Sequence, residues 1–159
     1  MKIVINTCFG GFSLSPLGYK RYAELIGKTA YFFSSKAKDG KLDISKHYPT
    51  SIDEAKDEFM FTVFSVPNPD EIITRDKEWN EMTMDERTAS NELYSSIHIY
   101  ANDIERNDPN LIKVVVELGD EVNGKCSKLE IIDIPDGVDY VIEEYDGNEH
   151  IAEKHRTWR

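Results

Sequence analysis

The stretch from Thr7 to Ser15 holds the residue types of this sequence that are best suited to bind a ligand. It follows the apolar run from Ile3 to Ile5 and contains two adjacent glycines, Gly10 and Gly11. A strand that enters a Gly-Gly turn and leaves as a helix offers backbone N–H groups and a helix N-terminus to a phosphate. The stretch therefore predicts a site for a small anionic or nucleotide-like ligand, although it lacks the spacing of a P-loop or a dinucleotide fingerprint.

The predicted ligand pocket combines this loop with cations and an aromatic side chain. Residues 1–50 carry eight Lys and Arg against three Asp and Glu, net +5, whereas residues 51–159 carry eleven against twenty-seven, net −16. An anion should therefore bind in the basic part of the chain, and the C-terminal tail would add a cation and an aromatic wall. The predicted site residues are Phe9, Gly10, Gly11, Phe12, Ser13, Ser15, Lys20, Arg21, Arg156 and Trp158.

A purely structural role for the same residues is the alternative. In a tight turn, Gly10 and Gly11 would supply positive φ angles while Phe9 and Phe12 pack inward. Trp158 would then dock the C-terminus onto the sheet.

The two cysteines raise the question of catalysis. Cys8 follows a strand and precedes a helix, a position that can lower the pKa of a thiol, and His150 or His155 would serve as its base. No known thiol-enzyme signature surrounds it, and a buried structural cysteine is the simpler alternative. Cys8 and Cys126 lie 118 positions apart without a CxxC motif, which predicts free thiols in a reducing compartment. The histidines are scattered, so we expect no metal site and no cofactor.

The net charge of −11 argues against direct binding of nucleic acid or of anionic membranes, because phosphate contacts need Lys and Arg. The acidic excess would keep the protein soluble, or would imitate nucleic acid in a basic groove of another protein. No apolar run approaches the roughly 20 residues of a membrane span, and the N-terminus does not resemble a signal peptide. We therefore expect the protein in the cytoplasm.

The elements that must position these residues follow from local patterns. A β-branched run predicts a strand at 2–6, and Ser15 before Pro16 predicts a capped helix over 16–26. An apolar stripe behind Asp108-Pro109 predicts another helix to residue 122. We also expect helices at 51–56 and within 84–93, strands at 30–34 and 97–100, a central strand at 58–66, and a meander of strands at 129–134, 140–145 and 149–154.

Both ends of the chain resemble a known group of proteins. The N-terminal pattern INxCFGGFxLS at 5–15, the EEYDG pattern at 143–147 and the AEKHRTW pattern at 152–158 carry this resemblance, together with the stretch 108–126. They are similar to an uncharacterised family of small proteins encoded mainly by bacteriophages and prophages. The resemblance covers roughly the first 30 and the last 55 residues. It implies a phage protein in the cytoplasm of an infected host, and it implies no reaction.

Together these patterns predict one α+β domain over residues 1–159, with a mixed or largely antiparallel sheet, two or three packed helices and a C-terminal β-meander. We expect a non-enzymatic binding protein that antagonises host defence or host machinery, either by holding a small anionic ligand or by blocking a host protein. A small enzyme that uses Cys8 and an acidic mimic of nucleic acid are the alternatives. An uncovered sheet edge would also allow a homo-oligomer.

Overall fold

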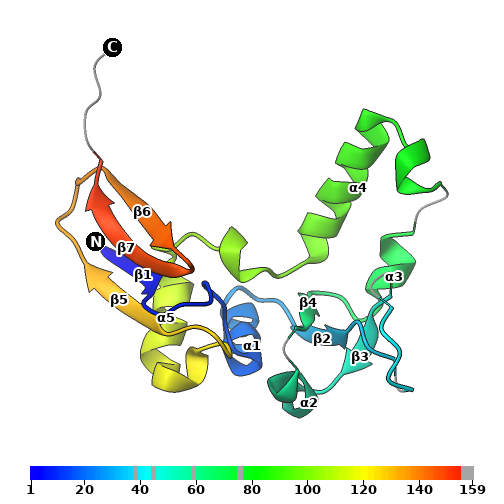
Figure 1. Cartoon of the computed structure of the whole chain (residues 1–159), viewed down its shortest axis with the longest axis horizontal. Helices are drawn as coiled ribbons and strands as arrows, with labels where there is room; N and C mark the ends of the chain where they lie inside the picture. The colour runs from blue at the N-terminus through cyan, green and yellow to red at the C-terminus, as the bar shows by residue number, and fades with distance from the viewer. Residues whose placement is uncertain (38, 44–45, 59, 75–76, 155–159) are drawn as a thin grey trace. The chain divides into compact units, whose positions relative to one another are not determined.

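The computed structural model of the protein describes residues 1–37, 39–43, 46–58, 60–74 and 77–154. Arg156 and Trp158 of the predicted pocket, and His155, lie outside these residues. The backbone falls into two compact units, of which unit 1 comprises residues 1–26 and 101–159 and unit 2 comprises residues 27–100. Helices and antiparallel strands occur in both units (Figure 1), which confirms the α+β class. The single domain over 1–159 stays a prediction.

Unit 1 contains two antiparallel strand pairs, β1 with β5 and β6 with β7. Val4 of β1 lies opposite Ile131 of β5. The expected C-terminal meander is therefore only a hairpin, because β5 pairs with the buried β1, whose backbone groups need a partner. In chain order the elements, with η marking 3₁₀ helices, are β1 (Lys2–Asn6), α1 (Pro16–Leu25), η2 (Ala101–Asp103), α5 (Pro109–Leu118), η3 (Gly119–Val122), β5 (Leu129–Asp133), β6 (Tyr140–Tyr145) and β7 (Asn148–Glu153).

The two long helices of unit 1 begin at the caps that the sequence predicts. The Ser15 hydroxyl accepts a hydrogen bond of 3.1 Å from the amide of Gly18, with Pro16 at the first helical position. The Asp108 carboxylate accepts from two amides in the first turn of α5. Such caps each stabilise a helix by about 1 kcal/mol. The Ser15 cap determines where α1 begins, and hence where the loop from Thr7 to Ser15 ends.

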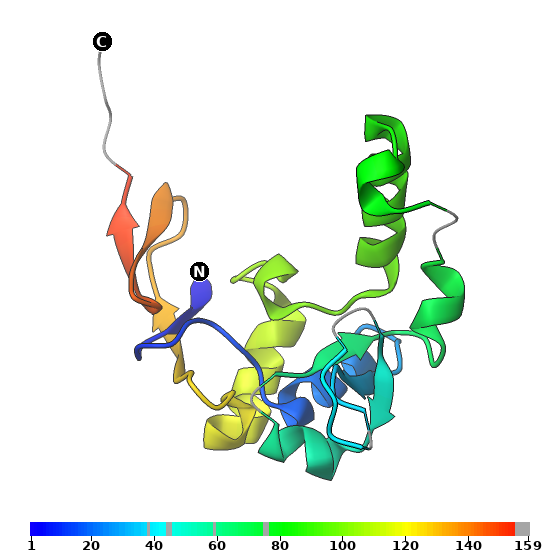
Figure 2. The same ribbon diagram turned by 45° about the vertical axis from the view of Figure 1, so that its right-hand side comes forward.

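The core of unit 1 lies where α5 meets α1 and the β1–β5 pair. Figures 1 and 2 both show α5 beside these two strands. The side chains that are almost fully buried are Ile3, Val4, Leu14, Leu111, Val114 and Val122. The loop before α1 is thus attached at both ends to the core through Ile3 to Ile5 and Leu14.

Unit 2 is built on a three-stranded antiparallel sheet in the order β3-β2-β4. Its elements are β2 (Tyr31–Ser34), β3 (Tyr48–Thr50), α2 (Ile52–Asp57), β4 (Thr62–Phe64), α3 (Pro69–Ile72), η1 (Trp79–Glu81) and α4 (Met84–Ile97). The prediction of a central strand at 58–66 is wrong, because β2 is the central strand and β4 is only three residues long; Phe59 lies outside the described residues. The strand expected at 97–100 is reduced to a single bridge between Phe64 and His98, since α4 continues to Ile97.

An aromatic cluster forms the core of unit 2. Phe33 and Phe64 pack edge to face, with ring centroids 5.6 Å apart, and Ile97 of α4 completes the cluster. The His47 ring lies against Phe64 and its Nδ1 atom is 2.5 Å from an oxygen of Asp70. Within the described part of the chain, no helix has the length and apolar character needed to cross a membrane.

Candidate functional site

The loop from Thr7 to Ser15, here called the double-glycine loop, packs directly on the turn of the C-terminal hairpin. Gly10 and Gly11 have φ angles of +124° and +93°, which confirms the predicted positive values. The Gly10 amide donates to the carbonyl of Asp146 at 3.2 Å. A Cβ atom on Gly147 would lie 2.8 Å from both the Gly10 amide nitrogen and the Gly11 Cα, so only glycine fits there. The sequence patterns at 5–15 and 143–147 therefore meet in space.

Asn6, at the end of β1, ties these segments together. Its side chain is fully buried, and its Nδ2 atom donates to the carbonyls of Cys8 at 2.7 Å and of Gly147 at 2.6 Å. Its Oδ1 atom accepts from the Lys128 amide at 2.7 Å. A buried amide that makes all these bonds specifies one arrangement of loop, turn and strand. The polar residue at the end of an otherwise apolar strand was the sequence signal for this role.

A largely buried ion pair between Arg106 and Glu149 supports the loop. Glu149 of β7 is 9% exposed, and its carboxylate forms two hydrogen bonds with Arg106, of 2.9 and 3.3 Å. The same carboxylate accepts a hydrogen bond of 2.8 Å from the backbone N–H of Asn6. The Arg106 guanidinium carbon lies 3.3 Å from the centroid of the Phe12 ring. Burial lowers the pKa of Arg106 and the Glu149 charge opposes that shift, so the guanidinium stays charged.

Phe12 and Phe9 have opposite environments. Phe12 is buried, as the turn interpretation predicts, whereas Phe9 is 62% exposed, so the expectation that Phe9 packs inward is wrong. The space behind the loop is filled by Cys126, since a Cβ on Gly10 would lie only 2.5 Å from its Cβ. Tyr145, which precedes the hairpin turn, is 79% exposed.

The N-terminus of α1 is closed by the protein itself. The Ser15 hydroxyl donates to the Glu121 carbonyl at 2.5 Å while accepting from the Gly18 amide. The Ser13 carbonyl accepts from the Ser127 hydroxyl at 2.7 Å. The Ser15 hydroxyl predicted to help bind an anion is therefore used for packing the loop on η3.

The predicted cations Lys20 and Arg21 are paired with carboxylates on the helices. Arg21 donates to Glu117 of α5 at 2.7 Å and to Glu24 at 3.3 Å. The hydrogen bond from Arg21 lowers the pKa of Glu117. Lys20 lies 3.9 Å from Glu24. These carboxylates compete with any external anion, although surface pairs of this kind contribute little to stability.

In the described part of the chain, Cys8 has no base among its hydrogen-bond partners. Its thiol donates to the carbonyl of Cys126 at 3.3 Å and to the side-chain oxygen of Asn6 at 3.5 Å, and neither oxygen is basic. His150 pairs with Glu143 at 3.0 Å on the exposed hairpin. Among the described residues, no group of three or more His, Cys, Asp or Glu side chains is placed to hold a metal ion.

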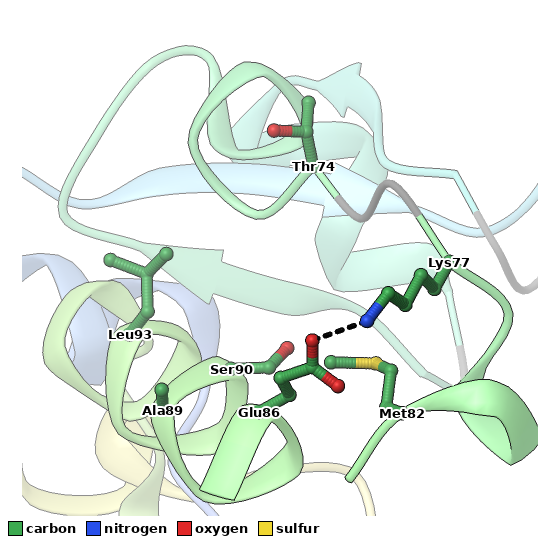
Figure 3. Close-up of a pocket in the computed structure, with 7 residues that line it drawn as sticks. All are labelled: Thr74, Lys77, Met82, Glu86, Ala89, Ser90 and Leu93. Carbon is green, nitrogen blue, oxygen red and sulfur yellow. Dashed lines mark hydrogen bonds and ion pairs between the residues drawn. The ribbon is translucent and has the colours of Figure 1, made fainter.

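Unit 2 has a cavity of about 320 Å³ that the sequence did not indicate (Figure 3). It combines apolar side chains of Met82 and Leu93 with an ion pair of 2.5 Å between Lys77 and Glu86. The lining residues are Thr74, Lys77, Met82, Glu86, Ala89, Ser90 and Leu93. These residues all lie within 74–93, on α4 and on the irregular stretches before it. The sequence of this region is polar and has no regular period, so it did not indicate a cavity.

Glu86 is expected to remain ionised below the pH at which an ordinary glutamate is protonated. The hydrogen bond from Lys77, and then that from the Thr83 amide, lower the pKa of Glu86 from 4.5 to about 2. Because the folded-state pKa is depressed, its contribution to stability is present above pH 4.5 and is lost as the pH falls towards 2. NMR titration of the Glu86 carboxyl carbon measures this pKa. Lys77→Gln should move the midpoint back towards 4.5, and a wild-type midpoint at 4.5 would contradict the ion pair.

The segments 8–12 and 145–147, here called the loop–turn platform, are the candidate functional site. The structure brings most of the predicted loop residues together there, with Asn6, Arg106, Tyr145 and Glu149 as partners that were not among the predicted site residues. It places Lys20 and Arg21 in helix ion pairs instead. In comparisons with protein families, curated proteins and solved structures, no match to this chain is found.

Proposed function

We propose that this chain is a phage-encoded binding protein that engages a host protein through the loop–turn platform and catalyses no reaction. The observation that carries the proposal is the exposure of two aromatic side chains, Phe9 at 62% and Tyr145 at 79%, on segments joined by the Gly10–Asp146 hydrogen bond. Aromatic residues dominate the binding energy of protein interfaces. The site of action would be the cytoplasm of the infected bacterium.

The platform is ordered before any partner binds. Asn6 holds both segments, and neither Gly10 nor Gly147 has space for a side chain. A backbone that is already held in place loses little conformational entropy on association. Exposed aromatics on such a backbone are therefore well suited to bind.

The charge of the hairpin favours a protein partner over a small anion. Glu143, Glu144 and Asp146 are exposed beside Tyr145. These carboxylates repel anions, and they attract a surface in which Lys and Arg surround an apolar pocket. The partner expected from this chemistry is a host protein with a basic groove.

Phe9→Ser is expected to weaken capture of the partner about thirtyfold while leaving the melting temperature unchanged. Loss of an aromatic anchor costs about 2 kcal/mol or more of binding energy, whereas an exposed side chain contributes little to folding. The measurement is quantitative pull-down from host lysate, followed by titration of the captured protein.

Val116→Ser is the matched control, because Val116 is 68% exposed on α5 of the same unit. Equal binding by the two variants, or absence of a captured protein, would contradict the proposal. A thermal shift by nucleotides that Phe9→Ser leaves intact would support the small-ligand alternative instead.

A further inference from the structure

The two cysteines, 118 positions apart in the chain, meet beneath the double-glycine loop. The Sγ atom of Cys8 lies 3.3 Å from the carbonyl oxygen of Cys126. Two residues further along, Gly10 packs on the Cβ of Cys126, which a side chain at position 10 would displace. The Cys8 thiol is thus already in contact with the backbone of residue 126.

The pair is accessible and chemically asymmetric. Cys126 is exposed, whereas Cys8 is partly buried and holds the internal hydrogen bonds described above. Lys128 lies within electrostatic reach of Cys8: the pKa of Lys128 is raised mainly by its hydrogen bond with Glu130, and in smaller part by Cys8. An exposed first thiol and a sheltered second one match the order of events in thiol–disulfide exchange.

We propose that Cys8 and Cys126 form a redox-sensitive pair, which a low-molecular-weight disulfide such as oxidised glutathione converts into an intramolecular disulfide. The Cys126 thiolate attacks one sulfur of oxidised glutathione, which breaks that disulfide, forms a mixed disulfide on Cys126 and releases one glutathione thiolate. The Cys8 thiolate then attacks the Cys126 sulfur and releases the second glutathione thiolate. The protein loses two protons and two electrons, and oxidised glutathione is reduced to two molecules of glutathione.

To form the bond, the exposed Cys126 side chain must turn towards the Cys8 thiol, which already lies against the carbonyl of residue 126. Cys8 directly precedes Phe9, so the crosslink would fix the loop that carries this aromatic side chain. Cytoplasmic disulfides are usually transient and redox-sensing, which agrees with free thiols in the structure.

The test incubates the purified full chain in glutathione buffers of rising oxidised fraction, followed by intact mass, thiol alkylation and non-reducing peptide mapping. The wild type should lose the mass of two hydrogen atoms and both reactive thiols, with peptides containing Cys8 and Cys126 joined. Its melting temperature should rise by about 5 to 10 °C, because the crosslink closes a long loop.

Cys8→Ser keeps a donor for the Cys126 carbonyl and should fold, but it should stop at the mixed disulfide on Cys126. Cys126→Ser should keep Cys8 reduced, and Cys8→Ala provides a second variant without the resolving thiol. A wild type that retains both thiols in every buffer, or that accumulates as much mixed disulfide as Cys8→Ser, would overturn the proposal.

Discussion

Glu149→Ala is expected to lower the free energy of unfolding by about 3 to 5 kcal/mol, because it leaves the Arg106 guanidinium buried without a counter-charge. Arg106 is only 17% exposed, and its face is covered by the Phe12 ring. The substitution also removes the carboxylate that accepts a hydrogen bond from the backbone N–H of Asn6. Both of these interactions help to hold the double-glycine loop in place.

Urea unfolding followed by circular dichroism measures this effect. Glu143→Ala is the control, because Glu143 is 57% exposed in its pair with His150, and such pairs contribute at most about 1 kcal/mol. Glu149→Gln keeps an acceptor for Asn6 while removing the charge, so it should be less damaging than alanine. Equal effects of Glu149→Ala and Glu143→Ala would show that the buried pair does not support the loop.

Local patterns were sufficient to predict the elements that carry their own start signals. A serine or aspartate followed by proline marks the first turn of α1 and of α5, and the structure confirms both caps. The β-branched run at β1 is confirmed with its predicted bounds. These signals involve residues within one helical turn or one strand, so no knowledge of tertiary structure is needed.

Pairing between distant segments was not predictable in the same way. A strand pattern shows that residues 129–134 are extended, but not that β1, more than 120 positions away, is their partner. The aromatic-rich segment 58–66 has two apolar faces, a pattern that predicts a central strand. In the structure β4 is short, and the aromatic side chain of Phe64 is buried by α4 and His47 rather than by a further strand.

The site shows the same limit. The glycines indicated a turn with positive φ, and that prediction is confirmed. Their packing on Gly147 depends on the position of the hairpin, which no local rule gives. Lys20 and Arg21 follow the loop in the sequence, and this position predicts that they bind an anion. In the structure the helical turn directs Arg21 to Glu117 of α5 instead.

Gly147→Ala is expected to destabilise the protein by about 3 kcal/mol or more, for two separate reasons. The φ angle of +83° costs a residue with a Cβ about 1 to 2 kcal/mol. The new methyl group would also overlap backbone atoms of Gly10 and Gly11, which cannot turn aside as the end of a flexible side chain can, and such overpacking adds about 1 to 3 kcal/mol.

Gly137→Ala separates these two contributions. Gly137 has a φ angle of +82°, almost the same as that of Gly147, but a Cβ there would have no atom within 4 Å. It should therefore lose only the 1 to 2 kcal/mol of backbone strain. Chemical unfolding of both variants gives the difference, expected to be about 2 kcal/mol, which is the steric contribution of the loop–turn contact. If the two variants are equally stable, the double-glycine loop does not pack on the hairpin turn, and the platform that presents Phe9 and Tyr145 is not formed.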